Sequence, residues 1–215
     1  RPFRLCESAA RSGRGGDGVR LASSDLFVSG EGLRGGDAGD TNDVIWICQD
    51  GGTGLFADAA SSARVLDVSL QGGAKGYPNG CGNPGQPFDG AGTFVFYTGS
   101  ARDLGAPRVA RDNSVVDVAL RGAAGDLVRL FSSGFTQYRH SVPFRGTLLV
   151  DRAAWTLQSS ATLDANGQLT LSLAVGDLSP GVEARIIHLQ ALFTGSLDGP
   201  VLGSASQLVV VDSSF

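Results

Sequence analysis

The chain has 215 residues, of which 42% are hydrophobic and 18% charged, so it can bury a core and is not disordered by composition. A formal net charge of −4 argues against a nucleic-acid binder, which would present a basic face to the phosphate backbone. No apolar run approaches the ~18 residues that a membrane-spanning helix requires.

Two stretches near the N-terminus are copies of one another, and a third, shorter copy follows them. Each copy opens on Gly-x-Gly followed by apolar residues, and helical signals are nearly absent from this region. A repeat of about 36 to 37 residues indicates one supersecondary unit stacked on itself. We therefore predict a short, irregular right-handed parallel β-helix, a solenoid, over residues 1–98, with residues 1–14 as an N-terminal arm. The three copies are residues 16–39, 52–76 and 90–97.

The loop after the first copy is rich in carboxylates. Asp37, Asp40 and Asp43 offer the hard oxygen ligands that Ca²⁺ prefers, so this loop is a candidate metal site. The alternative is that these carboxylates are solvated in a glycine loop, and no other cofactor is expected.

The three cysteines, Cys6, Cys48 and Cys81, lie in loops. The chain has no methionine, which indicates that an initiator has been removed, as happens when a signal peptide is cleaved. Because loop cysteines of exported proteins usually pair, we expect a disulfide between Cys48 and Cys81, which occupy similar places in successive copies, with Cys6 left over. Three free thiols in a cytosolic protein are the alternative.

The C-terminal half has a different pattern. Residues 99–113, which include Pro107 and several charges, are predicted to form a linker. Beyond it, strand-like runs recur about every ten residues, which is typical of a β-sandwich and predicts an immunoglobulin-like or fibronectin-like domain over 114–215. The Asn-Gly pair at 166 and 167 predicts a tight hairpin between two of these strands. The predicted strands are 114–120, 127–131, 147–150, 155–163, 168–175, 184–193 and 207–211.

The Gly-x-Gly openings, the paired glycines at 35–36 and 72–73, and the loop cysteines resemble the glycine-rich parallel β-helix repeats of proteins secreted by planctomycetes and similar bacteria. The resemblance covers roughly residues 15–98, and the C-terminal part looks like the small sandwich domain that closes many such proteins. It implies an all-β protein located outside the cell or on its surface, and it brings no catalytic residues with it.

We expect a structural subunit of an extracellular filament or surface assembly. The N-terminal end of the predicted solenoid, residues 1 to about 22, has no capping element, so it leaves unpaired strand edges. The apolar element 207–211 could pair with or pack against a neighbouring molecule. Because this contact joins two different surfaces, copies of the chain would polymerise head to tail.

The alternative is an adhesin or carbohydrate-binding module that contacts its ligand through three loop aromatics, Trp46, Tyr77 and Tyr138. A polysaccharide-active enzyme ranks third and is not the expectation. Glycoside hydrolysis requires a pair of carboxylates at the scissile bond. The strands predicted for the β-helix hold only Asp25 and Asp67, and these do not recur at equivalent positions of the repeat.

Overall fold

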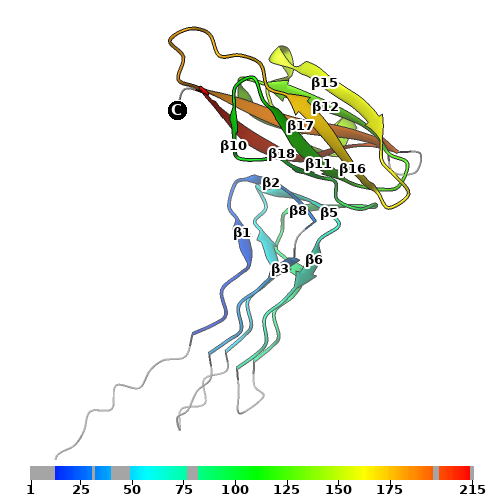
Figure 1. The fold of residues 1–215 in the computed structure, drawn as a ribbon. Helices are drawn as coiled ribbons and strands as arrows, with labels where there is room; N and C mark the ends of the chain where they lie inside the picture. The colour runs from blue at the N-terminus through cyan, green and yellow to red at the C-terminus, as the bar shows by residue number, and fades with distance from the viewer. Residues whose placement is uncertain (1–12, 31, 40–48, 77–81, 196–198, 214–215) are drawn as a thin grey trace, which may run out of the picture. The chain divides into compact units, whose positions relative to one another are not determined.

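The computed structural model describes residues 13–30, 32–39, 49–76, 82–195 and 199–213. The chain divides into two compact units, residues 1–96 and 97–215 (Figure 1). In the described ranges, every regular element except two single-turn 3-10 helices, η1 (Val142–Phe144) and η2 (Arg152–Ala154), is a β-strand. The all-β prediction is therefore confirmed.

The copies of the repeat pair with one another in parallel. Val19 lies opposite Leu55, Asp25 opposite Ser62 and Gly32 opposite Ser69, so equivalent positions of successive copies are in register. Three short sheets result, with the strand orders β1-β4-β7, β2-β5-β8 and β3-β6. Their strands are β1 (Val19–Leu21), β2 (Asp25–Ser29), β3 (Gly32–Arg34), β4 (Leu55–Ala57), β5 (Ser62–Leu66), β6 (Ser69–Gln71), β7 (Phe88–Asp89) and β8 (Thr93–Tyr97).

Glycine-rich segments of extended chain continue from these strands and pack backbone against backbone (Figure 1). The amide of Gly36 donates to the Gly16 carbonyl at 2.7 Å, and Gly52 donates to Gly36 at 2.9 Å. The series continues from Gly73 to Gly52 at 2.8 Å and from Gly85 to Gly73 at 2.9 Å. A Cβ added at Gly52 would overlap the Gly16 carbonyl. Glycine is therefore required here because neighbouring backbones leave no room for a side chain, as at the axis of collagen.

The structure does not show the expected parallel β-helix. Its repeat copies stack in parallel, but each strand has at most five residues, and much of each copy is glycine backbone without a side chain. A small cluster around Leu55, Ala57 and Val65 is the apolar core of this unit. The repeat period thus predicted the stacking, whereas the close contact between glycine backbones replaces the side-chain-filled interior of a solenoid.

The second unit is a β-sandwich, as predicted. A five-stranded sheet, in the order β10-β18-β17-β12-β15, packs against a three-stranded sheet, in the order β16-β11-β9. Alternating residues of both sheets form its core, with Val118, Val128, Leu130, Leu189 and Leu208 fully buried. The strands are β9 (Asp103–Gly105), β10 (Val109–Arg111), β11 (Val115–Arg121), β12 (Leu127–Ser133), β15 (Thr156–Thr162), β16 (Gln168–Ala174), β17 (Ala184–Gly195) and β18 (Gly199–Val211). A separate hairpin consists of β13 (Thr136–Ser141) and β14 (Gly146–Val150).

The seven runs predicted as strands in this half all contain one. The Asn-Gly turn also forms, with Gly167 at a φ of 71° and its amide bonded to the Asp164 carbonyl at 3.0 Å. The predicted hairpin is nevertheless wrong, because β15 pairs with β12 while β16 pairs with β11. The turn connects the two sheets of the sandwich and does not join neighbours within one sheet.

The segment expected as a linker, 99–113, contains β9 and β10, which pair with β11 and β18 of the sandwich. The side chain of Arg102 is 2% exposed and forms an ion pair with the equally buried carboxylate of Asp126. A buried charge is stable only when it is paired and hydrogen-bonded, so this contact fixes the segment to the sandwich.

We predict that Gly52→Ala destabilises the first unit by about 1–3 kcal/mol, because the new methyl group would overlap the Gly16 carbonyl. Gly16→Ala is the matched control, since a Cβ at Gly16 meets no atom within 4 Å. Urea unfolding followed by circular dichroism measures the difference. Equal stability of the two variants would contradict the close packing of these backbones.

Candidate functional site

Four of the described carboxylates of the first unit accept hydrogen bonds from backbone amides about one repeat length away in the sequence. Asp17 accepts from the Thr53 amide at 3.0 Å, and Asp37 accepts from the Ala74 amide at 2.7 Å. Asp50 accepts from Asn83 at 2.7 Å, and Asp58 accepts from Ser23 at 3.1 Å. These side chains link successive copies of the repeat.

Asp37 is the described member of the candidate calcium site. Its carboxylate also forms an ion pair with Arg34 at 2.8 Å. The hydrogen bond from the Ala74 amide, together with the Arg34 guanidinium, holds the pKa of Asp37 below its usual value of 3.8. No group of three or more His, Cys, Asp or Glu side chains with metal-binding geometry occurs among the described residues. The Asp37 carboxylate therefore has a structural role in the stack, while Asp40 and Asp43 lie outside the described residues.

The predicted disulfide and two of the three predicted binding aromatics lie outside the described residues. These residues are Cys48 and Cys81, Trp46 and Tyr77, together with the leftover Cys6. Tyr138 is described, and it lies on strand β13, whereas a loop position was expected.

The hairpin that carries Tyr138 is fixed to the outer face of the five-stranded sheet. Gln190 of β17 is 1% exposed, and its side-chain amide bonds three backbone groups. It donates to the Thr147 and Gly203 carbonyls at 2.8 and 3.1 Å and accepts from the Leu149 amide at 3.1 Å. Because a buried amide that lost these partners would be costly, Gln190 fixes the position of the hairpin.

Tyr138 lies at a β-bulge in this hairpin. Thr136 opposes Val150 and Arg139 opposes Leu148, so Gln137 and Tyr138 together face the single residue Leu149. A bulge redirects the side chains of its extra residue, and Tyr138 is 69% exposed. It lines a pocket of about 390 Å³, which we call the Tyr138 pocket, together with Thr136, Gln137, Leu149, His188, Ala205, Ser206 and Gln207.

An apolar strip lies on the five-stranded sheet one row beyond this pocket. Val109, Val209 and Ile186 are cross-strand neighbours on β10, β18 and β17. Val109 and Ile186 are among the exposed large hydrophobic residues. The next row contains Gln207 opposite His188, which line the Tyr138 pocket. This strip could not be predicted from the sequence, because the alternation of β17 does not reveal that β10 extends the sheet.

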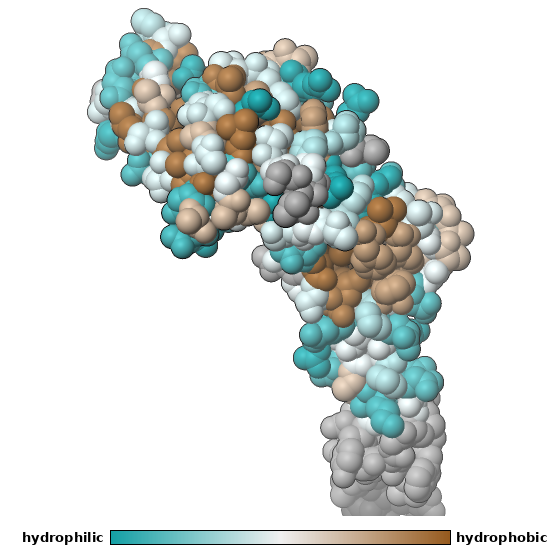
Figure 2. All heavy atoms as spheres, turned by 90° about the vertical axis from the view of Figure 1, so that its right-hand side faces the viewer, coloured by the Kyte–Doolittle hydropathy of each residue, from teal (hydrophilic) through white to brown (hydrophobic). Residues whose placement is uncertain are grey.

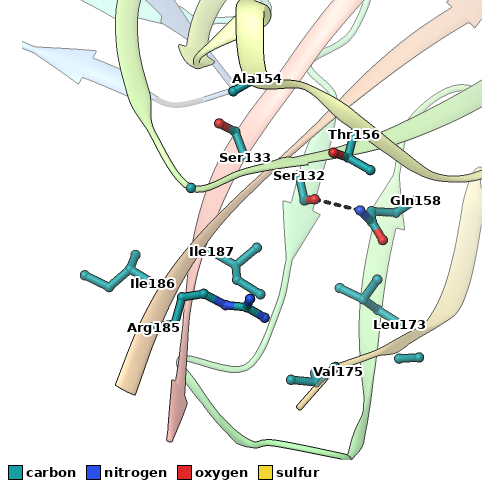
Figure 3. Close-up of a pocket in the computed structure, with 13 residues that line it drawn as sticks. Ser132, Ser133, Ala154, Thr156, Gln158, Leu173, Val175, Arg185, Ile186 and Ile187 are labelled. Carbon is teal, nitrogen blue, oxygen red and sulfur yellow. Dashed lines mark hydrogen bonds between the residues drawn. The ribbon is translucent and has the colours of Figure 1, made fainter. Parts of the chain in front are cut away.

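A second pocket, of about 350 Å³, opens between the two sheets of the sandwich, and we call it the edge pocket (Figure 3). Leu173, Val175 and Ile187 form its apolar part, and the Arg185 side chain extends beside Ile187. On its polar rim, Gln158 donates to the Ser132 hydroxyl at 2.7 Å. Gln158 is the extra residue of a bulge in β15, because Leu130 opposes Ser159 and Phe131 opposes Leu157. None of these residues was among the predicted site residues.

An aromatic patch marks the third copy in the first unit (Figure 2). The ring of Phe88 lies 5.2 Å from that of Phe94 and 5.1 Å from that of Phe96. Phe94 packs against the core cluster, while Phe88 and Phe96 are 46% and 50% exposed. Exposed rings in contact with one another are a recognised feature of interaction surfaces.

No protein-family model matches the chain, and no curated protein matches it. Among solved structures, a superoxide reductase (neelaredoxin) from Ignicoccus hospitalis is similar with 12% identity and a TM-score of 0.34, over 51% of this chain and 80% of that one. A proposed superoxide reductase from Thermotoga maritima is similar with 10% identity and a TM-score of 0.33, over 51% of this chain and 85% of that one. Likenesses of this size carry no functional argument. Within the described ranges, no helix has the length and apolar character needed to span a membrane.

We predict that the first unit loses stability on acidification. The folded-state pKa of Asp37 is lowered, so its contribution is present above pH 3.8 and is lost as the pH falls through the folded-state value. The pKa of Asp58 is lowered as well, by the Ser61 hydroxyl and the Ser23 amide. Asp37→Asn should therefore reduce the dependence of the urea midpoint on pH between about pH 6 and pH 3. An unchanged dependence in this variant would contradict the assigned role of Asp37.

Proposed function

We propose that this chain is an adhesin-type carbohydrate-binding module of an extracellular or cell-surface protein. The observation that carries the proposal is Tyr138, an exposed ring that a bulge places at a pocket lined by both apolar and polar side chains. A sugar ring presents C–H groups on its faces and hydroxyls at its rim. An aromatic ring beside side-chain amides and hydroxyls offers contacts to both.

The polar groups around Tyr138 suit this ligand class. Gln207 is exposed, and Ser206 and His188 are half-buried beside it, so hydroxyl, imidazole and amide groups face the same space. Gln137 is already held by the Val150 carbonyl at 3.0 Å. Gln207 and His188 are therefore the proposed hydrogen-bonding partners of the sugar hydroxyls.

The fold proposed for the binding unit is immunoglobulin-like or fibronectin-like. Support comes from the strand order, in which the first strands of the unit, β9 and β10, lie at the edges of opposite sheets. The parallel pairing of β10 with the last strand, β18, also suits such a sandwich.

Tyr138→Ala is predicted to abolish binding on a glycan array, because the exposed ring supplies the stacking surface. Phe135→Ala is the matched control, since Phe135 is also an aromatic residue, 67% exposed, but does not line the pocket. Tyr138→Phe should keep most of the binding. Failure of the intact protein to bind any glycan, or equal binding by the alanine variants, would contradict the proposal.

A second candidate function is self-assembly into a filament or surface layer. Within the described ranges, β1, β2 and β3 of the first copy each pair on one side only, as do β7 and β8 of the third. A parallel stack with two different open ends can continue from one molecule to the next. The apolar element 207–211, which was expected to contact a neighbouring molecule, is unsuitable for this role. It belongs to β18, which is already paired with β10 and β17, and its Leu208 and Val210 are buried. The aromatic patch of the third copy is the surface that replaces it in this proposal.

If assembly uses this patch, replacing Phe88 and Phe96 by serine should lower the molecular mass that light scattering reports at high concentration. Phe135→Ser, at an exposed phenylalanine of the other unit, should leave the mass unchanged. A monomeric intact protein at high concentration would rule out this second function.

A further inference from the structure

We propose that the edge pocket binds an extended peptide segment of a partner protein, which adds to the free edge of β17 beside Arg185. The segment carries an acidic residue two positions after an apolar one. This inference concerns a different site from the proposed carbohydrate site and does not depend on it.

The five-stranded sheet has a gap beside the first residues of β17. β12 ends with Ser133 opposite His188, and the chain then turns away at Gly134. Residues 184–187 of β17 extend beyond that point, and within the described part of the chain they pair with β18 alone. Their other edge, with its backbone amides and carbonyls, faces the edge pocket, which Arg185, Ile186 and Ile187 line. A free edge of this kind accepts an added strand.

An apolar surface lies between the two sheets. Leu173 of β16 and Val175, which directly follows that strand, are buried, and Ile187 packs against the same core. In the close-up, Ile187, Leu173 and Val175 lie around one space (Figure 3). A side chain that enters the gap opposite Ile187 would reach this surface, so an apolar residue is favoured at that position of the ligand.

The edge pocket carries a positive charge on Arg185. Arg185 is exposed, and no carboxylate of the described residues forms an ion pair with it. It lies two residues before Ile187, so both side chains are on the same face of β17. A cross-strand partner opposite Arg185 is therefore favoured when it carries a carboxylate.

The register fixes the order of the two ligand residues. A segment that continues the sheet in the place of β12 runs antiparallel to β17, as β12 does. It meets Ile187 first and Arg185 two residues later, which gives the order apolar, any residue, acidic. The edge strands β9 and β10, one in each sheet, are protected from strand addition in two ways. Each has only three residues, and each has charged residues within it or beside it.

The probe is the end-blocked peptide acetyl-Thr-Val-Thr-Asp-Thr-amide, titrated into the full ¹⁵N-labelled chain and followed by NMR. We expect shift changes and slower hydrogen exchange at residues 184–187. Replacing the aspartate by asparagine should weaken binding about fivefold to tenfold. Arg185→Gln should remove the difference between the two peptides, and it should leave the fold intact because Arg185 is exposed. Arg129→Gln, an exposed arginine on β12, is the control and should keep the difference.

Three results would overturn the inference. They are equal binding of the aspartate and asparagine peptides, tighter binding of the reversed order acetyl-Thr-Asp-Thr-Val-Thr-amide, and the absence of shift changes at 184–187 with every peptide. A response confined to the Tyr138 pocket is one form of the third result, and it leaves the carbohydrate proposal to its own test.

Discussion

The close approach of glycine backbones is the constraint on which the first unit depends. Glycine backbones form hydrogen bonds within a copy, from Gly36 to Gly16 and from Gly73 to Gly52, and between copies, from Gly52 to Gly36. They approach so closely that a Cβ atom at Gly52 or Gly73 would overlap a carbonyl of the first copy. The conformational entropy that glycine loses on folding must therefore be offset by these bonds and by a small apolar cluster. Carboxylates such as Asp17 and Asp37 complete the links between copies.

The second unit obtains its candidate sites from irregularities in an otherwise regular sandwich. A bulge exposes Tyr138, and another places Gln158 at the rim of the edge pocket. The early end of β12 leaves residues 184–187 without a neighbour on one side. Bulges and strand ends are where side chains and backbone groups become available without a cost to the core, since the core residues keep their alternation. In the first unit, by contrast, most of the described carboxylates accept hydrogen bonds from backbone amides.

The sequence predicted regular features well and irregular ones poorly. Alternation located all seven strands predicted for the sandwich, and the predicted repeat period of about 36 to 37 residues agrees with the 37-residue separation of the paired Asp25 and Ser62. The strands β9, β10 and β13 were missed because charged or glycine-containing segments of three to six residues carry too little alternation. The Asn-Gly turn was found, but local turn chemistry does not reveal which strands pair, and that choice is made by burial against β11 and β12. Tyr138 was predicted as a binding residue because an exposed aromatic ring was expected there. Arg185 was not predicted, because its candidate role depends on where β12 ends, and no local sequence pattern shows that position.

Hydrogen exchange of individual glycine amides tests the central claim, that backbone contacts between glycines hold the repeat copies together. The amides of Gly36, Gly52, Gly73 and Gly85 donate to carbonyls of neighbouring segments, so they should exchange much more slowly than amides of exposed turn glycines such as Gly181. Slow exchange of all four, lost together when Gly52 is replaced by alanine, is the predicted result. Exchange of these four amides at the rate of Gly181 would show that the glycine segments do not pack as described.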